Sequence, residues 1–168
     1  MNPLRWSFRR QCLLGFFACA GLIGYAIYLQ FVEQLQPCPF CIFQRVAFAG
    51  LGLVFLLAAM HGPRKAAPRK RWGIFGAAAA LVGAGIAARH VWVQLYPPDI
   101  PACGPGISFM VEQRGWVGTV NKVLTGSGDC SDIDWMFLGL SMPMWSLVWF
   151  VLLGAWVLWA GFVRRRQH

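Results

Sequence analysis

The chain has 168 residues, of which 58% are hydrophobic and only 12% are charged, and its formal net charge is +9. One water-soluble domain of this size needs a more polar surface than this composition supplies. The composition therefore argues against an ordinary soluble domain. It directs attention to segments of about 20 apolar residues, which is the length that crosses a lipid bilayer.

Four apolar segments of that length follow one another along the chain. We expect transmembrane helices over about residues 12–31, 41–60, 72–90 and 143–163, with a long loop over about 91–142 between the third and the fourth. The first apolar run is longer than the core of a signal peptide, so we interpret it as a retained helix. No soluble domain is left over. The sequence thus predicts a single all-α membrane domain, a four-transmembrane-helix bundle.

Charged residues are divided unevenly among the segments outside these helices. The amino-terminal segment, the connection over 61–71 and the carboxy-terminal tail hold basic residues and no acidic residue, whereas all six acidic residues lie in the two other loops. By the positive-inside rule, both termini face the cytoplasm and the long loop faces the outside. A nucleic-acid-binding patch is the alternative explanation of the net charge. The split among three membrane-flanking segments, without a recognition motif, disfavours it, so we expect a lipid bilayer and no nucleic acid as partner.

The stretch QPCPFCIFQR, residues 36–45, places a C-x-x-C pair, Cys38 and Cys41, at the outer end of the second helix. This spacing also occurs in metal sites and in structural disulfides, so alone it decides little. Pro37 and Pro39 suit the start of a helix and put Cys41 in its first turn. Free amide hydrogens and the positive end of the helix dipole stabilise a thiolate there. The local sequence therefore favours redox chemistry.

Arg45 follows Cys41 by four residues, so both lie on the same face of the helix, with the arginine about 6 Å deeper. An arginine this close to the interface can extend its charged end to the lipid headgroups and have no further role. Beside a helix-terminal cysteine, a fixed cation also stabilises the thiolate and can hold a polar, electron-accepting head group. We therefore predict that the thiol pair lies between an aqueous donor and a lipid-soluble acceptor, with Arg45 on the acceptor side.

Two further cysteines, Cys103 and Cys130, lie in Gly- and Pro-rich stretches of the long outer loop. A bridge between them would be exposed and able to exchange with external thiols, or it would simply brace the loop. Four cysteines could instead bind zinc. Since Cys103 and Cys130 do not form a second close pair, we expect no metal. Residues 107–124 are predicted to form a short helix on the bilayer surface, although two glycines weaken that pattern.

His90 ends the third helix on the same outer side as Cys41. An interfacial histidine is usually just solvated, but a two-electron acceptor must also take up protons, and histidine titrates in the useful range. The remaining cysteines, Cys12 and Cys19, are seven residues apart within the first helix. We interpret them as small buried apolar residues.

Taken together, these features resemble the DsbB family of bacterial inner-membrane disulfide bond formation proteins. The resemblance covers nearly the whole chain. CPFCIFQR carries the family's C-x-x-C with an arginine four positions on, and QLYP (94–97) precedes the first loop cysteine at the family's spacing. SGDC (127–130) and FLGLSMPMW (137–145) are similar to the stretch that leads into the last helix. His90 occupies the position of a histidine linked to quinone reaction, preceded here by Arg89 where some members have an acid.

The resemblance implies a protein-dithiol:quinone oxidoreductase of the inner membrane whose cysteines face the periplasm. A reduced DsbA-like oxidase of the thioredoxin fold would attack a Cys103–Cys130 disulfide, most readily at Cys103. Electrons would then pass to Cys38–Cys41, and from Cys41 to ubiquinone, or to menaquinone when oxygen is absent. The residues that the resemblance implies as catalytic are Cys38, Cys41, Cys103, Cys130 and Arg45. Those implied to bind the quinone are Cys41, Arg45, His90, Met142 and Trp145.

Other functions fit parts of the pattern. A vitamin K epoxide reductase-like protein also couples quinone to C-x-x-C chemistry, but its loop cysteines precede the C-x-x-C, whereas here they follow it. A non-catalytic membrane protein with structural disulfides or a metal site is a second alternative, which stoichiometric zinc and no quinone-dependent thiol oxidation would indicate. A reductase that passes electrons outward is a third, because sequence does not determine direction.

Overall fold

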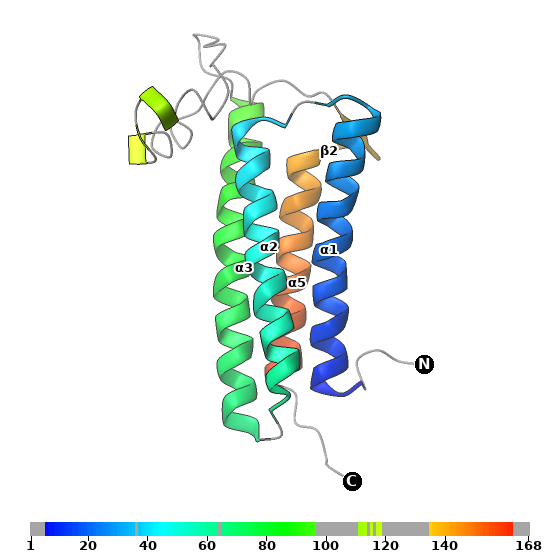
Figure 1. Cartoon of the computed structure of the whole chain (residues 1–168), viewed down its shortest axis with the longest axis vertical. Helices are drawn as coiled ribbons and strands as arrows, with labels where there is room; N and C mark the ends of the chain where they lie inside the picture. Colours follow the sequence, from blue (N-terminus) through cyan, green and yellow to red (C-terminus); the bar gives the residue numbers. More distant parts are fainter. Residues whose placement is uncertain are drawn as a thin grey trace.

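The computed structural model describes residues 6–35, 37–63, 65–96 and 135–162, with a few residues between 111 and 118. Four long helices stand side by side as one bundle (Figure 1), and each is long and apolar enough to cross a membrane. This confirms the predicted all-α four-helix membrane bundle. The helices are α1 (Phe8–Val32), α2 (Pro39–His61), α3 (Ala66–Leu95) and α5 (Met142–Phe162).

The ends of the helices follow from local capping. Ser7 precedes α1, and its side-chain oxygen accepts a hydrogen bond from the backbone N–H of Arg10 at 3.4 Å. Cys38 caps the start of α2, and Pro39 occupies the first helical position, where a missing N–H costs little. Gly62 ends α2 in the left-handed conformation, with φ 51°, which glycine adopts without a steric penalty.

Small residues let α3 and α5 approach each other closely, and this pair forms the most extensive helix contact of the bundle. A Cβ on Gly83 of α3 would lie only 2.2 Å from the ring of Phe150 on α5. That ring in turn stacks on Phe48 of α2, with centroids 3.9 Å apart. Contact between α1 and α5 is much less extensive, so space remains between these two helices.

The two ends of the bundle differ in chemistry. At one end α1 and α3 begin and α2 and α5 end (Figure 1), and basic side chains gather in the terminal turns there: Arg9, Arg10, Lys65, Arg69, Lys70 and Arg71. The start of α2, with Cys38 and Cys41, lies at the opposite end, together with the last turns of α3. The thiol pair is therefore separated from the basic residues by the length of the bundle.

A short antiparallel hairpin, β1 (Met136–Phe137) and β2 (Leu140–Ser141), leads directly into α5. Its two turn residues, Leu138 and Gly139, both have positive φ angles, 51° and 78°, as a type I′ hairpin turn requires. These residues were expected to lie in the loop. A leucine at positive φ is unusual, so the sequence carries little sign of this turn.

Two hydrogen bonds attach the hairpin to the bundle. The indole Nε1–H of Trp145 in α5 donates to the carbonyl oxygen of Phe137 at 3.0 Å. The hydroxyl of Ser141 donates to the side-chain oxygen of Gln94 in α3 at 2.7 Å. The hairpin therefore bridges α3 and α5 at the end of the bundle that carries the thiol pair.

Several predictions concern residues that the structure does not describe. Cys103 and Cys130 both lie outside the described residues, and so does most of the surface helix expected over 107–124. The disulfide and the surface helix expected there stay predictions.

Candidate functional site

Cys38 and Cys41 form a closely spaced thiol pair at the start of α2. Their Sγ atoms are 3.1 Å apart, a hydrogen-bond distance, and no disulfide joins them in this structure. The Sγ of Cys38 donates in that contact, and it accepts the backbone N–H of Cys41 at 3.4 Å. Cys38 therefore caps α2 in the way that serine or aspartate usually does, with a sulfur in place of an oxygen.

This capping uses one of the free amide hydrogens at the start of the helix. We expected the helix start to favour a thiolate on Cys41, which does lie in the first turn. In the structure the backbone N–H of Cys41 points instead to the sulfur of Cys38, because a capping side chain reaches forward to the amide three residues on. The hydrogen bond from the helix start thus stabilises negative charge on Cys38.

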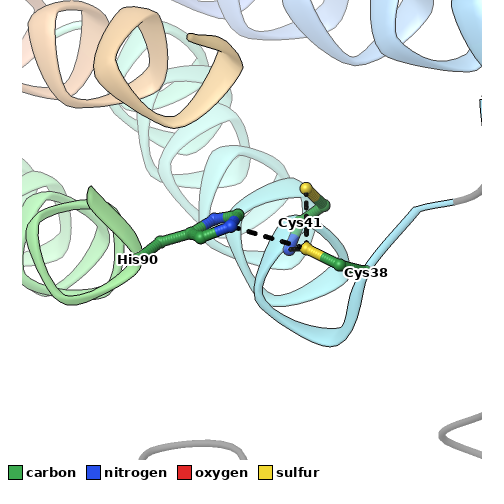
Figure 2. Close-up of side chains that lie close together, drawn as sticks. All are labelled: Cys38, Cys41 and His90. Carbon is green, nitrogen blue, oxygen red and sulfur yellow. Dashed lines mark hydrogen bonds between the residues drawn. The ribbon is translucent and has the colours of Figure 1, made fainter. Parts of the chain in front are cut away.

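His90 reaches Cys38 from the neighbouring helix α3 (Figure 2). Its Nε2 lies 3.6 Å from the Sγ of Cys38, and its Nδ1 lies 3.0 Å from the side-chain nitrogen of Gln44. With the Gln44 amide nitrogen turned toward the ring, Nδ1 is the acceptor, because an amide nitrogen can only donate; the ring proton is then on Nε2, facing the sulfur. The imidazole is 2% exposed and stacks on the ring of Phe40, with centroids 5.2 Å apart.

Two N–H groups therefore point at the sulfur of Cys38, one from the backbone of Cys41 and one from His90. Hydrogen bonds of this kind strengthen when the acceptor carries a negative charge. The arrangement favours negative charge on Cys38 when the pair exchanges, and it leaves Cys41 to face a different part of the molecule.

Cys41 faces a cavity of about 290 Å³ between α1, α2, α5 and the hairpin. The cavity lies where α1 and α5 contact each other little. Its walls are mostly apolar and aromatic with a few polar groups, as in sites that bind small organic molecules. The lining residues are Leu22, Ile23, Tyr25, Ala26, Cys41, Gln44, Arg45, Phe48, Trp135, Phe137, Met142, Trp145, Ser146 and Trp149.

Arg45 lies in the cavity wall and is held there by α1. One guanidinium nitrogen donates to the side-chain oxygen of Gln30 at 2.6 Å, and another donates to the backbone oxygen of Ala26 at 3.1 Å. The side chain is half-buried. These bonds are made within the protein, so the geometry favours a cation that serves the cavity over one that extends to lipid headgroups.

The structure brings most of the described candidate residues together. Cys41, Arg45, Met142 and Trp145 all line the cavity. His90 does not line it and instead contacts Cys38. Gln44 connects the two places, because it lines the cavity and hydrogen-bonds His90.

Sequence reasoning missed Gln44 and Gln30, which position His90 and Arg45. A signal was present, because a polar side chain within an apolar membrane span is costly unless it has a partner. It also missed aromatic residues of the cavity on the hairpin and the neighbouring helices. Their side chains meet only after the chain folds: Tyr25, Trp135, Phe137 and Trp149.

Comparison with known proteins gives consistent similarities over the full length. The family model described as disulfide bond formation protein DsbB matches residues 8–160. The chain is 62% identical over 168 residues to Disulfide bond formation protein B of Xanthomonas euvesicatoria pv. vesicatoria (strain 85-10), covering 99% of this chain and 98% of that relative. It is 52% identical over 168 residues to Disulfide bond formation protein B of Xylella fastidiosa (strain 9a5c), covering 99% of this chain and 97% of that relative.

Proposed function

Because this chain belongs to the DsbB family of disulfide bond formation proteins, we propose that it reoxidises a periplasmic DsbA-like thiol oxidase and passes the two electrons to a membrane quinone. In this role it is a protein-dithiol:quinone oxidoreductase of the bacterial inner membrane. Both termini face the cytoplasm and the cysteines face the periplasm. The gathering of basic side chains at the end of the bundle opposite Cys38 supports this orientation.

The first step takes place in the long loop. A thiolate of the reduced DsbA-like oxidase attacks the Cys103–Cys130 disulfide, most readily at Cys103, and forms a mixed disulfide. The second thiol of the oxidase then attacks this mixed disulfide. The oxidase leaves with a new disulfide, and Cys103 and Cys130 remain as a dithiol. Two electrons and two protons have moved to the loop, and one new disulfide is present in the soluble partner.

In the second step the loop dithiol reduces a Cys38–Cys41 disulfide. We place the attack at Cys38, because Cys41 then leaves as a thiolate in the cavity that it shares with the cation of Arg45, where the acceptor binds. Completion of the exchange leaves a Cys103–Cys130 disulfide and two thiols at the start of α2. The 3.1 Å separation of those sulfurs and the N–H donors at Cys38 support a pair that opens and closes with little movement.

In the third step the pair becomes a disulfide again, and two electrons leave through Cys41. A quinone would supply an acceptor of two electrons and two protons. It would be ubiquinone, or menaquinone when oxygen is absent. The apolar and aromatic lining suits its ring and tail, and Met142 and Trp145 form part of that lining. Arg45 presents a fixed positive charge to a polar head group in the same cavity.

His90 holds a proton beside this chemistry. Its Nε2–H faces Cys38, and Gln44 links the imidazole to the cavity wall. When the thiols give up their electrons their protons must also leave, and this N–H, 3.6 Å from the sulfur of Cys38, stabilises the negative charge that the sulfur then carries. We propose this role for His90 in place of direct contact with the head group.

The observation that carries the proposal is that Cys41 and Arg45 share one aromatic-lined cavity, while Cys38 lies against His90 outside it. The test mixes purified full-length protein, reduced DsbA-like oxidase and a short-chain quinone, and follows quinone absorbance. Cys38→Ser and Cys41→Ser should each abolish quinone reduction, whereas the buried control Cys12→Ala/Cys19→Ala should turn over normally. Full turnover in either serine variant would overturn the scheme.

A further inference from the structure

Three donor atoms that favour thiophilic metals converge at the start of α2. The sulfur atoms of Cys38 and Cys41 and a ring nitrogen of His90 all lie within 4.8 Å of one another (Figure 2). They come from two helices whose packing brings them together. We propose that the reduced form of this pair, together with His90, is a zinc-binding site.

The donor set and its dimensions suit zinc. Two cysteine sulfurs and one histidine nitrogen form a known three-ligand set, with a fourth position open to water. With Zn–S about 2.3 Å and Zn–N about 2.0–2.1 Å, tetrahedral angles place a sulfur and a nitrogen about 3.6 Å apart and two sulfurs about 3.8 Å apart. The distance from Cys38 Sγ to His90 Nε2 is already 3.6 Å, whereas the sulfurs, at 3.1 Å, must separate by a small side-chain rotation.

Charge also favours a divalent ion at this place. Two thiolates and a neutral imidazole carry a total charge of −2, so Zn²⁺ makes the set neutral. A neutral set is the arrangement that a poorly solvated site tolerates best. Cys38 and Cys41 are half-buried and His90 is buried, so the neutrality of the set matters here more than it would on an open surface.

Gln44 can support the metal-bound form as well as the present one. Zinc on Nε2 requires the ring proton to be on Nδ1, the nitrogen that Gln44 contacts at 3.0 Å. A rotation of the amide by 180° replaces its nitrogen with its oxygen, which then accepts that proton. Such a partner fixes the orientation of a ligating histidine and raises metal affinity.

Binding depends on redox state, because a Cys38–Cys41 disulfide removes two of the three ligands. Conversely, bound zinc occupies both sulfurs and keeps the pair from closing into a disulfide. If the proposed function holds, zinc therefore stops electron flow by holding the enzyme reduced at these two residues. Zinc binding itself does not depend on that function.

The test measures zinc affinity directly, by competition with a chromophoric chelator, on full-length protein in detergent. Cys103→Ser/Cys130→Ser protein is used so that the loop thiols contribute nothing. After reduction it should bind one zinc per chain. Loss of a residue that supports a metal ligand lowers metal affinity by roughly 10- to 100-fold. Gln44→Leu should lower the zinc affinity within that range, and His90→Ala, which removes a ligand, should lower it by more. The exposed histidine variant His61→Ala should bind as the parent does.

X-ray absorption of the zinc-loaded parent keeps the test decisive if a variant fails to fold. The proposal expects two sulfur ligands at about 2.3 Å and nitrogen or oxygen ligands at about 2.0 Å. A site with sulfur ligands alone, equal affinity in well-folded His90→Ala protein, or equal binding by the oxidised protein would each overturn it.

Discussion

Replacing Arg45 by alanine should weaken quinone binding far more than it weakens the interaction with the soluble oxidase. The guanidinium lies in the cavity wall next to Cys41, whereas in the proposed scheme the oxidase meets the loop cysteines. A hydrogen bond to a charged group contributes about 1.5–3 kcal/mol. Since 1.4 kcal/mol corresponds to a factor of ten, we expect the KM for a short-chain quinone to rise by about 10- to 150-fold.

A second effect of the same substitution needs its own control, because Arg45 also ties α2 to α1 through Gln30 and Ala26. Gln30→Leu removes the side-chain acceptor and leaves the cation in place, so it should raise the quinone KM only slightly. Arg45→Lys keeps the charge but loses the planar fork, so its quinone KM should lie between those of the parent and Arg45→Ala.

The assay measures initial rates of quinone reduction, first with quinone varied at saturating reduced oxidase and then with reduced oxidase varied at saturating quinone. The KM for the oxidase should change less than about twofold. An unchanged quinone KM in folded Arg45→Ala protein would show that the cation does not serve the acceptor. A Gln30→Leu variant that reproduces the whole rise would show that Arg45 acts only by holding α1.

Three further substitutions test other parts of the site. Gln44→Leu removes the donor that keeps the histidine proton on Nε2. Negative charge on Cys38 should lose about 1 kcal/mol of stabilisation, so alkylation of Cys38 should slow by several-fold. An unchanged rate and pH profile would refute the tautomer assignment. Trp145→Phe removes the hydrogen bond that attaches the hairpin to α5, so it should lower the free energy of unfolding by about 1 kcal/mol and raise the quinone KM. Parental values of the unfolding free energy and of the KM would show that the hairpin does not shape the cavity. Gly83→Ala forces the buried ring of Phe150 to move and should lower the free energy of unfolding by about 1–3 kcal/mol. Gly85→Ala, where a Cβ meets nothing within 4 Å, should not destabilise the protein. Thermal unfolding in detergent that ranks the two variants in the opposite order would contradict the packing.

The four helices could be predicted from sequence because a lipid environment requires long uninterrupted apolar runs. The position of Cys41 in the first turn of α2 followed from Pro39, which suits the first position of a helix. Both features are local, so a single segment of the chain contains the information. The family resemblance added the implied roles of residues far apart in the chain.

The contacts that organise the site could not be predicted in this way. Gln44 meets His90 and Arg45 meets Gln30 only because the helices pack at particular rotations. Those rotations depend on close contacts such as that of Gly83 with an aromatic ring, which no one segment encodes. For the same reason the sequence could not show that His90 faces the sulfur of Cys38.

The central claim is that the sulfur of Cys41 delivers electrons to an acceptor in the cavity that it shares with Arg45. The most direct measurement is a single turnover with Cys103→Ser/Cys130→Ser protein, reduced at Cys38 and Cys41, mixed rapidly with a short-chain quinone. We expect one quinol formed per chain and the loss of two thiols, and no quinol when Cys41 is also replaced by serine. Quinol formation at an undiminished rate without the Cys41 sulfur would contradict it.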